Sequence, residues 1–365
     1  MPHLSCGIVG LPNVGKSTLF NALTNAGAAV APYPFCTIDP NVGVVPIRDG
    51  RVDRIAEMVG APQKIYRTVE YVDVAGLVKD ASKGAGRGNQ FLEHVRACDA
   101  LVQVVRCFRD QNVAHVHGGI DPIEDIKVVN LELILADLQT VTNALDRVQK
   151  KARHEVEARA EAAALDKVRQ HLDHAQPVRT LSFSEEERHL LMPLRFLSSK
   201  SILYAVNIDE ADLPGAGHPL VCAVEAFAGA EGNAVIPICA KLEEELAKLD
   251  PADAQPFLDD LGLKEPGLQR LVRATNDLLC LVGFFTFNEK ECRAWTVVKG
   301  THARDAAGVI HSDFREHFIR AEVTAFDDFV RVGGAKAAHE KGLLRIEGRD
   351  YVVRDGDIIY FRIGA

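Results

Sequence analysis

The segment from Gly10 to Thr18 constrains the fold of this chain more than any other. It reads Gly-Leu-Pro-Asn-Val-Gly-Lys-Ser-Thr: a glycine, four residues, then Gly-Lys-Ser. Apolar residues 6–9 before it predict a short buried strand, and residues 19–23 after it predict a helix. This order is typical of a P-loop, in which backbone N–H groups and a helix N-terminus hold phosphate. A glycine-rich turn that binds nothing is disfavoured because strand, loop and helix agree.

The composition indicates a globular protein of two or three domains. The 365 residues are too many for one small core, and 47% are hydrophobic and 25% charged. A net charge of −9 argues against a general nucleic-acid binder, so any RNA contact would need a local basic patch. The sequence has no apolar run of about 18 residues and no signal-peptide pattern. Its eight cysteines form no C-x-x-C pair. We therefore expect reduced thiols, a cytoplasmic location and no membrane partner.

Side chains around the P-loop predict a magnesium–triphosphate site. Lys16 can reach the β- and γ-phosphates, and the Ser17 hydroxyl can complete a Mg²⁺ shell. Thr37 lies in a proline-rich loop, where P-loop switches carry a threonine that joins the metal. Asp73 ends a predicted strand and can hold the metal through water, and Gly76 can offer its N–H to the γ-phosphate. We therefore predict Ser17, Thr37 and Asp73 as metal ligands and Lys16 as catalytic.

The residue after Gly76 departs from the pattern of Ras-like switches. Position 77 is a leucine, where Ras-like proteins carry a glutamine that orients the attacking water. Hydrolysis is therefore slow, or another group orients the water. The predicted elements here are strands at 42–46, 64–73, 100–106 and 201–206, and helices at 51–59 and 89–98.

Five motifs resemble the YchF (Obg-like ATPase) family, and the resemblance covers essentially the whole chain. These motifs are residues 10–18, 37–41, 73–78, 84–88 and 106–108. The family implies an α/β P-loop NTPase domain with a mostly parallel sheet, an inserted α-helical coiled-coil hairpin and a C-terminal α+β ubiquitin-like TGS domain. We place the OBG-type G domain at 1–278, interrupted by the hairpin at 122–199, and the TGS domain at 279–363.

The segment Asn207-Ile-Asp-Glu210 bears on which base is bound. Guanine-specific switches carry N-K-x-D here, and the aspartate pairs with guanine. Ile208 replaces the lysine and Glu210 the aspartate, so guanine loses a charge-assisted pair worth about 1–3 kcal/mol per bond. Asp209 leaves a second register open. The resemblance implies a preference for ATP over GTP, with Asn207 and Ile208 as base contacts and Cys239-Ala240 as the loop that covers the base. The predicted nucleotide-binding residues are Asn13, Val14, Gly15, Lys16, Ser17, Thr18, Gly76, Asn207, Ile208, Glu210, Cys239 and Ala240.

Two residues are candidates to compensate for the missing glutamine. The resemblance points to His115 as a catalytic histidine, since an imidazole with a pKa of about 6.5 can position or deprotonate water. A loop histidine without a role is the equal alternative, and His117 could be confused with it. Asn13 resembles the asparagine of potassium-dependent relatives, so K⁺ is a second possible cofactor beside Mg²⁺.

Residues 122–199 predict the helical insertion. Apolar spacing predicts one long amphipathic helix over 125–161, a second helix from 162 to 174, and a third capped by Ser184. Together they predict an antiparallel coiled coil. The basic run 147–153 could contact RNA or be a solvated helix face. A metal at His171 and His174 is the less favoured interpretation of that pair.

Short β-rich runs after Phe287 predict the C-terminal module. They lie at 292–298, 322–324, 343–348, 351–353 and 358–361, with helices predicted at 303–310 and 312–319. We find no nucleophile–base pair there and predict binding, not catalysis.

The combined prediction is a magnesium-dependent ATPase, monomeric, that acts as a nucleotide-controlled switch. By resemblance its partner is the ribosome or ribosomal RNA. Two alternatives stay open: a GTP-specific Obg-like GTPase, and a nucleotide-binding ribosome or stress-response adaptor with negligible catalysis.

Overall fold

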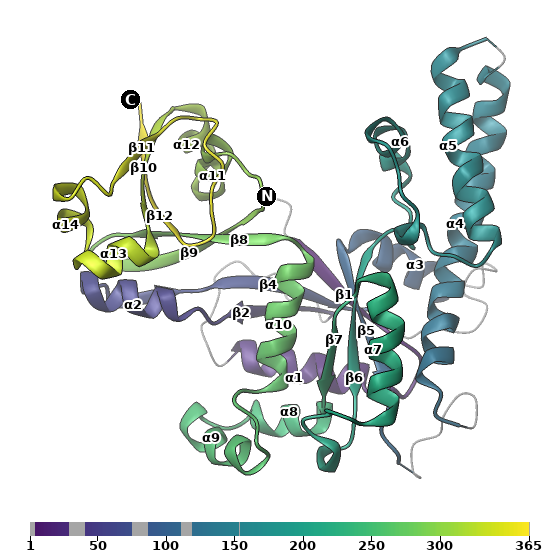
Figure 1. Ribbon diagram of the computed structural model, residues 1–365, viewed down its shortest axis with the longest axis horizontal. Coiled ribbons are helices and arrows are strands. Elements are labelled where there is room, and N and C mark those ends of the chain that lie inside the picture. Colours follow the sequence, from purple (N-terminus) through teal and green to yellow (C-terminus); the bar gives the residue numbers. More distant parts are fainter. Residues whose placement is uncertain (1–3, 29–40, 75–86, 111–118, 153, 365) are drawn as a thin grey trace. The chain divides into compact units, whose positions relative to one another are not determined.

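The computed structural model describes residues 4–28, 41–74, 87–110, 119–152 and 154–364, arranged in two compact units (Figure 1). The P-loop unit comprises Leu4–Gly43 and Glu70–Ala274. The C-terminal unit includes Val44–Val69 and Thr275–Ala365. Residues 44–69, placed in the G domain from sequence, therefore belong to the compact C-terminal unit. Domain boundaries at 278 and 279 remain a prediction.

A six-stranded sheet of order β2-β4-β1-β5-β6-β7 confirms the α/β fold class. The pairs β1–β4, β1–β5, β5–β6 and β6–β7 are all parallel, as expected where helices connect successive strands. The strands are β1 (Ser5–Val9), β2 (Val42–Ile47), β4 (Arg67–Asp73), β5 (Ala100–Arg106), β6 (Ser201–Asn207) and β7 (Val235–Ile238).

Helices flank this sheet, with α1 packed along β1 and α7 along β6 and β7 (Figure 1). Strand β5 is buried along its whole length, as expected for a central parallel strand that helices cover on both faces. Parallel strands place their carboxyl ends at one edge, where the P-loop and Asn207 therefore meet. The helices are α1 (Lys16–Ala28), α3 (Arg87–Ala97), α7 (Pro219–Glu231), α8 (Ala240–Leu246), α9 (Pro251–Asp260) and α10 (Gly267–Leu278).

The predicted helical insertion is present between β5 and β6, but its first break was misplaced. Helix α4 (Pro122–Ala152) and helix α5 (Val156–Asp173) lie side by side (Figure 1). The prediction of one helix over 125–161 is wrong, because the chain leaves the helix between Ala152 and Val156. Alanines and charged residues there carry little periodic signal. The third helix, α6 (Glu185–Leu191), begins as predicted: Ser184 accepts from the N–H of Glu187 in a capping box.

A buried carboxylate fixes the base of the hairpin. Asp137 on α4 is fully buried and accepts bonds from the N–H groups of Leu197 and Ser198, each at 2.8 Å, and from the Ser198 hydroxyl at 2.7 Å. Burial raises the pKa of Asp137, and these bonds oppose the shift. The contacts join α4 to the chain that returns to β6.

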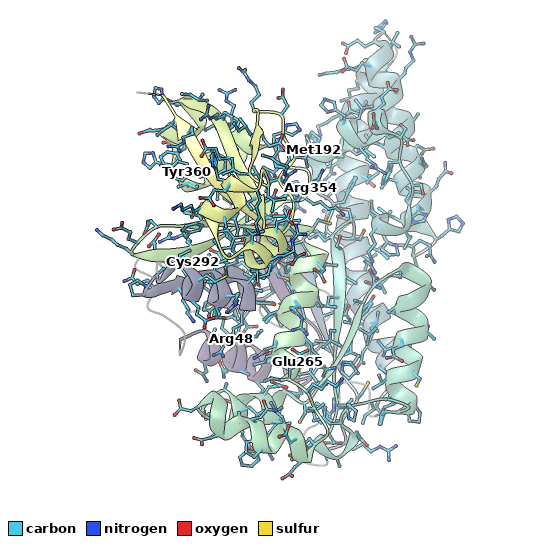
Figure 2. All side chains as sticks on the ribbon, turned by 60° about the vertical axis from the view of Figure 1, so that its left-hand side comes forward. Arg48, Met192, Glu265, Cys292, Arg354 and Tyr360 are labelled. Carbon is cyan, nitrogen blue, oxygen red and sulfur yellow. The ribbon has the colours of Figure 1, made fainter. Side chains whose placement is uncertain are left out.

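The C-terminal unit contains a second sheet, of order β11-β10-β12-β8-β9-β3. Two hydrophobic clusters flank it, one including Phe284 and Ala307, the other including Phe285 and Phe329. Figure 2 labels two residues with opposite environments: Cys292 is fully buried, whereas Tyr360 is exposed. The strands are β3 (Gln63–Ile65), β8 (Leu281–Phe287), β9 (Glu291–Val298), β10 (Phe318–Ala325), β11 (Arg345–Glu347) and β12 (Asp357–Ile363).

Three predictions for this part of the chain need correction. The strand predicted over 64–73 is two strands, because β3 pairs with β9 in this sheet while β4 joins the other. The helix predicted over 312–319 ends at Glu316, and β10 begins at Phe318. Residues 351–353 form only an isolated bridge, between Val352 and His302. Helices α13 and α14 were missed. The helices here are α2 (Gly50–Val59), α11 (Ala303–Ile310), α12 (Ser312–Glu316), α13 (Phe326–Val332) and α14 (Ala335–Glu340).

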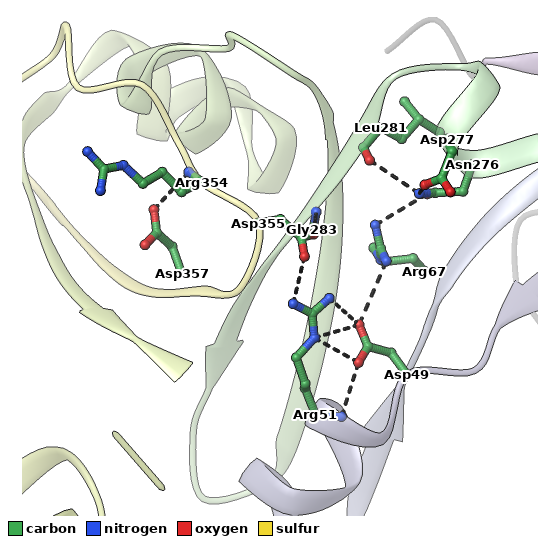
Figure 3. Close-up of polar contacts among 10 residues, drawn as sticks. All are labelled: Asp49, Arg51, Arg67, Asn276, Asp277, Leu281, Gly283, Arg354, Asp355 and Asp357. Atoms are coloured by element: carbon green, nitrogen blue, oxygen red, sulfur yellow. Dashed lines mark hydrogen bonds and ion pairs between the residues drawn. The ribbon is translucent and has the colours of Figure 1, made fainter. Parts of the chain in front are cut away.

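A polar network explains why residues 44–69 belong to the C-terminal unit (Figure 3). Arg51 donates to Asp49 through Nε at 2.9 Å and to Asp355 through Nη1 at 2.7 Å. Asp355 also accepts from the N–H of Gly283 on β8, at 2.8 Å. Arg67 is buried and donates to Asn276 at 3.3 Å. The network therefore joins three segments distant in sequence.

Candidate functional site

The P-loop has the backbone geometry that its glycines predict. Gly10 and Gly15 have φ of 148° and 99°, and Asn13 has φ of 63°. A Cβ added at Gly10 would lie 2.6 Å from the carbonyl oxygen of Val104, and one at Gly15 would lie 2.3 Å from Asn207 Nδ2. Both positions therefore require glycine for space as well as for conformation. Helix α1 begins directly afterwards at Lys16, as an anion site at a helix N-terminus requires.

Lys16 is held inside the loop that it serves. Its side chain is 8% exposed, and Nζ donates to the carbonyl oxygen of Leu11 at 2.7 Å. Burial lowers the pKa of Lys16 to about 8, and the nearby Asp73 carboxylate opposes this shift. A triphosphate would supply negative charge to an ammonium group that burial destabilises. The arrangement therefore suits Lys16 for the predicted phosphate contact.

Oxygen donors at the same edge fit a magnesium ion. Asp73 is half-buried at the end of β4, and its pKa is raised by burial and lowered by Lys16. Ser17 is exposed at the start of α1, so its hydroxyl is accessible. A hydroxyl and a carboxylate are the hard oxygen ligands that Mg²⁺ takes together with phosphates. Within the described ranges no group of three or more His, Cys, Asp or Glu residues could hold a metal.

Asn207 bridges the P-loop and the predicted base loop. Its Nδ2 donates to the carbonyl oxygen of Val14 and its Oδ1 accepts from the N–H of Ala240, both at 3.0 Å. The side chain is only 6% exposed. Asn207 was predicted as a base contact, and the structure shows that its amide joins the two loops of the site. A direct contact with the base remains a prediction.

The residues after Asn207 differ in their environments. Ile208 is 1% exposed, and its N–H donates to the carbonyl oxygen of Ile238. Asp209 accepts from the N–H of Arg109 at 3.0 Å, whereas Glu210 is exposed. Cys239 is buried, and burial raises the pKa of its thiol. Of these four residues, Glu210 alone presents an exposed carboxylate, while Asp209 contributes to the loop itself.

The other predicted residues have the following positions. Val14 is buried, and Thr18 is half-buried on the first turn of α1. Thr37, Gly76 and His115 lie outside the described residues, so their roles remain predictions. The structure thus brings together Asn13–Thr18, Asp73, Asn207 and Ala240.

The histidine pair of the hairpin has protein partners. Nε2 of His171 contacts Thr180 Oγ1 at 2.8 Å, and Nδ1 of His174 contacts the carbonyl oxygen of Gln170 at 2.7 Å. These contacts favour the structural interpretation of the pair.

Sequence reasoning missed residues whose contacts support the loops of the site. The hydrogen bond from Arg109 to Asp209 joins segments 100 residues apart, and no local pattern reveals it. Glu243 offered a detectable signal: it is a carboxylate between Leu242 and Leu246 on the buried side of α8. A buried glutamate indicates a specific partner.

The fold and the site define a P-loop NTPase of the nucleotide-switch class. Residues 5–143 match the family described as 50S ribosome-binding GTPase. Residues 281–364 match the YchF-type GTPase C-terminal family, described as a protein of unknown function (DUF933).

Whole-chain relatives agree with this classification. The ribosome-binding ATPase YchF of Bacillus subtilis is 48% identical over 364 residues, covering 99% of this chain and 100% of that protein. The protein of the same name from Escherichia coli O157:H7 is 48% identical, with 98% of each chain covered. The solved structure of the Schizosaccharomyces pombe YchF GTPase has a TM-score of 0.90 and 34% identity, covering 99% of this chain and 98% of that one. The chain belongs to the YchF family.

In the part of the chain that is described, no helix is both long and apolar enough to cross a bilayer.

Proposed function

We propose that this protein is a magnesium-dependent ATPase that prefers ATP to GTP and acts as a nucleotide-controlled switch on the ribosome. The P-loop, with Lys16 held inside it, supports triphosphate binding. The relatives' name, ribosome-binding ATPase, supports the substrate and the partner. By the same proposal the protein works as a monomer in the cytoplasm, where ribosomes lie.

One observation carries the base preference. Guanine recognition needs a carboxylate held at a fixed position three residues after the asparagine. Here Glu210 occupies that position and is exposed, while the neighbouring Asp209 is engaged by Arg109. To pair with guanine, an exposed glutamate would lose rotamer entropy and give up its hydrogen bonds to water. This favours ATP, and weak GTP hydrolysis remains part of the proposal.

Three groups are proposed for the reaction itself. Lys16 would bind the phosphates, and Ser17, Thr37 and Asp73 would hold Mg²⁺, which would neutralise charge on the triphosphate. His115 would orient or deprotonate the attacking water, since Leu77 cannot.

The chain between the two predicted switch residues, Thr37 and Asp73, connects the nucleotide site to the C-terminal unit. Val44–Val69 lies between Thr37 and Asp73 in the sequence and belongs to the C-terminal unit. Any change of backbone position at both ends of the segment would therefore act on that unit through the chain itself. The proposal is that nucleotide state reaches the partner by this path.

Competition between ATP and GTP for the purified protein tests the substrate. The expected result is tighter Mg²⁺–ATP binding and single-turnover ATP hydrolysis, both lost in Lys16→Ala. A strong preference for GTP would support the GTP-specific alternative. Binding without hydrolysis would support the adaptor alternative.

Sedimentation with ribosomes tests the partner. We expect the fraction of protein that sediments with ribosomes to differ between the ATP-bound and ADP-bound forms, and Lys16→Ala to remove that difference. Equal sedimentation in every nucleotide state would contradict the switch.

Hydrolysis compared in sodium and potassium buffers tests the proposed K⁺ site at Asn13, and equal rates would exclude it.

A further inference from the structure

The loop predicted to cover the base is held from its outer side by α10. Strand β7 leads into Cys239 and Ala240, and α8 begins at Ala240. Asn207 holds this loop from the side of the P-loop. The start of α10 holds it from the opposite side through two sets of contacts, those of Glu243 and those of Arg270, which we call the α10 clamp.

Glu243 caps a helix to which it does not belong. It lies one turn into α8 and is 2% exposed. Its carboxylate accepts from the N–H of Gly267 at 2.6 Å and from the N–H of Leu268 at 3.3 Å. These are the first two N–H groups of α10, which have no partner within their own helix. Burial raises the pKa of Glu243, and these bonds together with Arg270 lower it. The carboxylate is thus matched to a helix N-terminus.

Arg270 returns the contact from α10 to β7. Its Nη2 donates to the carbonyl oxygen of Pro237 at 2.8 Å, two residues before Cys239. The packing around the clamp is close: a Cβ added at Gly267 would lie 2.8 Å from Glu243 Oε1 and 3.0 Å from Ile238 Cγ1. Residues 237–243 therefore have bonds to α10 on both sides of the base loop.

We propose that Glu243 and Arg270 are positioning residues that set the purine preference of the site by fixing the backbone of Cys239 and Ala240. The inference rests on the proposed function, in which this loop covers the base. Ala240 donates its N–H to Asn207, so a shift of α8 would also change the bridge to the P-loop. The clamp acts on the base end of the nucleotide, whereas Lys16 acts on the phosphate end.

The separation of the two ends makes the proposal testable. Equilibrium binding of Mg²⁺–ATP, Mg²⁺–GTP and inorganic tripolyphosphate would be measured for the full-length protein and its variants. Glu243→Ala should weaken ATP binding about tenfold, the loss of roughly one charged hydrogen bond. It should move the ATP-to-GTP affinity ratio toward one and leave tripolyphosphate affinity within about twofold. Arg270→Ala should act in the same direction.

Matched variants separate positioning from general damage. Glu245→Ala makes the same chemical change on an exposed position of α8 and should leave all three affinities unchanged. Glu243→Gln keeps one carbonyl acceptor and should restore part of the ATP affinity. If Glu243→Ala does not fold, Glu243→Gln and Arg270→Lys carry the same comparison.

Each contrary result has a different meaning. Unchanged ATP affinity and purine preference in the clamp variants would overturn the clamp and leave the proposed function standing. An equal loss of ATP and tripolyphosphate would show that Glu243 only supports the fold, and would also overturn it. A wild-type protein that binds tripolyphosphate but neither nucleotide would overturn the proposed function and the clamp together.

Discussion

Gly15→Ala tests whether the P-loop and Asn207 are built as one unit. A Cβ at Gly15 would lie 2.3 Å from Asn207 Nδ2, far inside van der Waals contact. The Asn207 side chain would have to move, and its bonds to Val14 and Ala240, each 3.0 Å long, would be lost. Gly15 also has φ of 99°, which an alanine adopts only with strain.

The expected magnitude follows from these two effects. Strain from a positive φ costs about 1–2 kcal/mol. Loss of two buried hydrogen bonds costs about 1 kcal/mol each, and more where a partner stays buried and unpaired. We therefore expect Gly15→Ala to lower the free energy of unfolding by about 3–5 kcal/mol.

Gly232→Ala is the matched control, in the same unit. Gly232 has φ of 73° at the end of α7, and a Cβ there would meet nothing within 4 Å. This variant carries the strain without the collision and should lose only about 1–2 kcal/mol.

Urea unfolding of the nucleotide-free proteins, followed by circular dichroism, measures both variants. Without nucleotide, lost phosphate contacts cannot contribute to the difference. If Gly15→Ala and Gly232→Ala lose the same stability, the collision with Asn207 is absent and the bridge does not join the two loops as described.

Four further predictions concern charged side chains. Burial lowers the pKa of Lys16 to about 8, whereas bound phosphate would keep its amino group charged. ATP affinity should therefore be constant below about pH 8 and fall by up to tenfold for each pH unit above about 8. Calorimetry should show this fall, and a flat profile for Lys16→Arg. The unfolded lysine retains its proton to higher pH, so the same shift should make stability rise with pH between about 8 and 10.5. Asp137→Ala should cost about 3 kcal/mol in urea unfolding because it leaves buried N–H groups unpaired, whereas the exposed Asp146→Ala should cost under about 0.5. Arg51→Leu should lower the stability of the C-terminal unit by about 1–2 kcal/mol, followed through the fluorescence of the only tryptophan, whereas Arg54→Leu should change it by under about 0.5.

Elements with a strong local signal were predictable from sequence. The P-loop combines backbone conformation, a helix start and a buried strand within 20 residues, so its geometry is specified locally. The Ser184 cap is equally local, since the hydroxyl and the Glu187 carboxylate are three residues apart. Such features need no knowledge of the tertiary fold.

Features that depend on distant partners were not predictable. A single strand over 64–73 was expected because this segment is rich in β-branched and aromatic residues. The chain instead divides at Tyr66, since β3 finds its partner in β9, more than 200 residues later. The break between α4 and α5 was misplaced because alanine-rich helices carry little periodic signal. In the site, the function of Asn207 as a bridge required the positions of Val14 and Ala240, which only the fold supplies.

Glu210 offers the sharpest remaining test of base choice. Its carboxylate is exposed, and ordering such a side chain against guanine costs about 1.5–2 kcal/mol of rotamer entropy. That cost is comparable with the gain from a charged hydrogen bond in contact with water. Glu210→Ala should therefore leave ATP affinity within about twofold and GTP affinity within about threefold, measured by calorimetry with both nucleotides. Asp209→Ala, which removes the bond to Arg109, should weaken both nucleotides equally because it loosens the loop and not one base contact. A loss of GTP binding above tenfold in Glu210→Ala alone would show that Glu210 recognises guanine, and the preference for ATP would then need another cause.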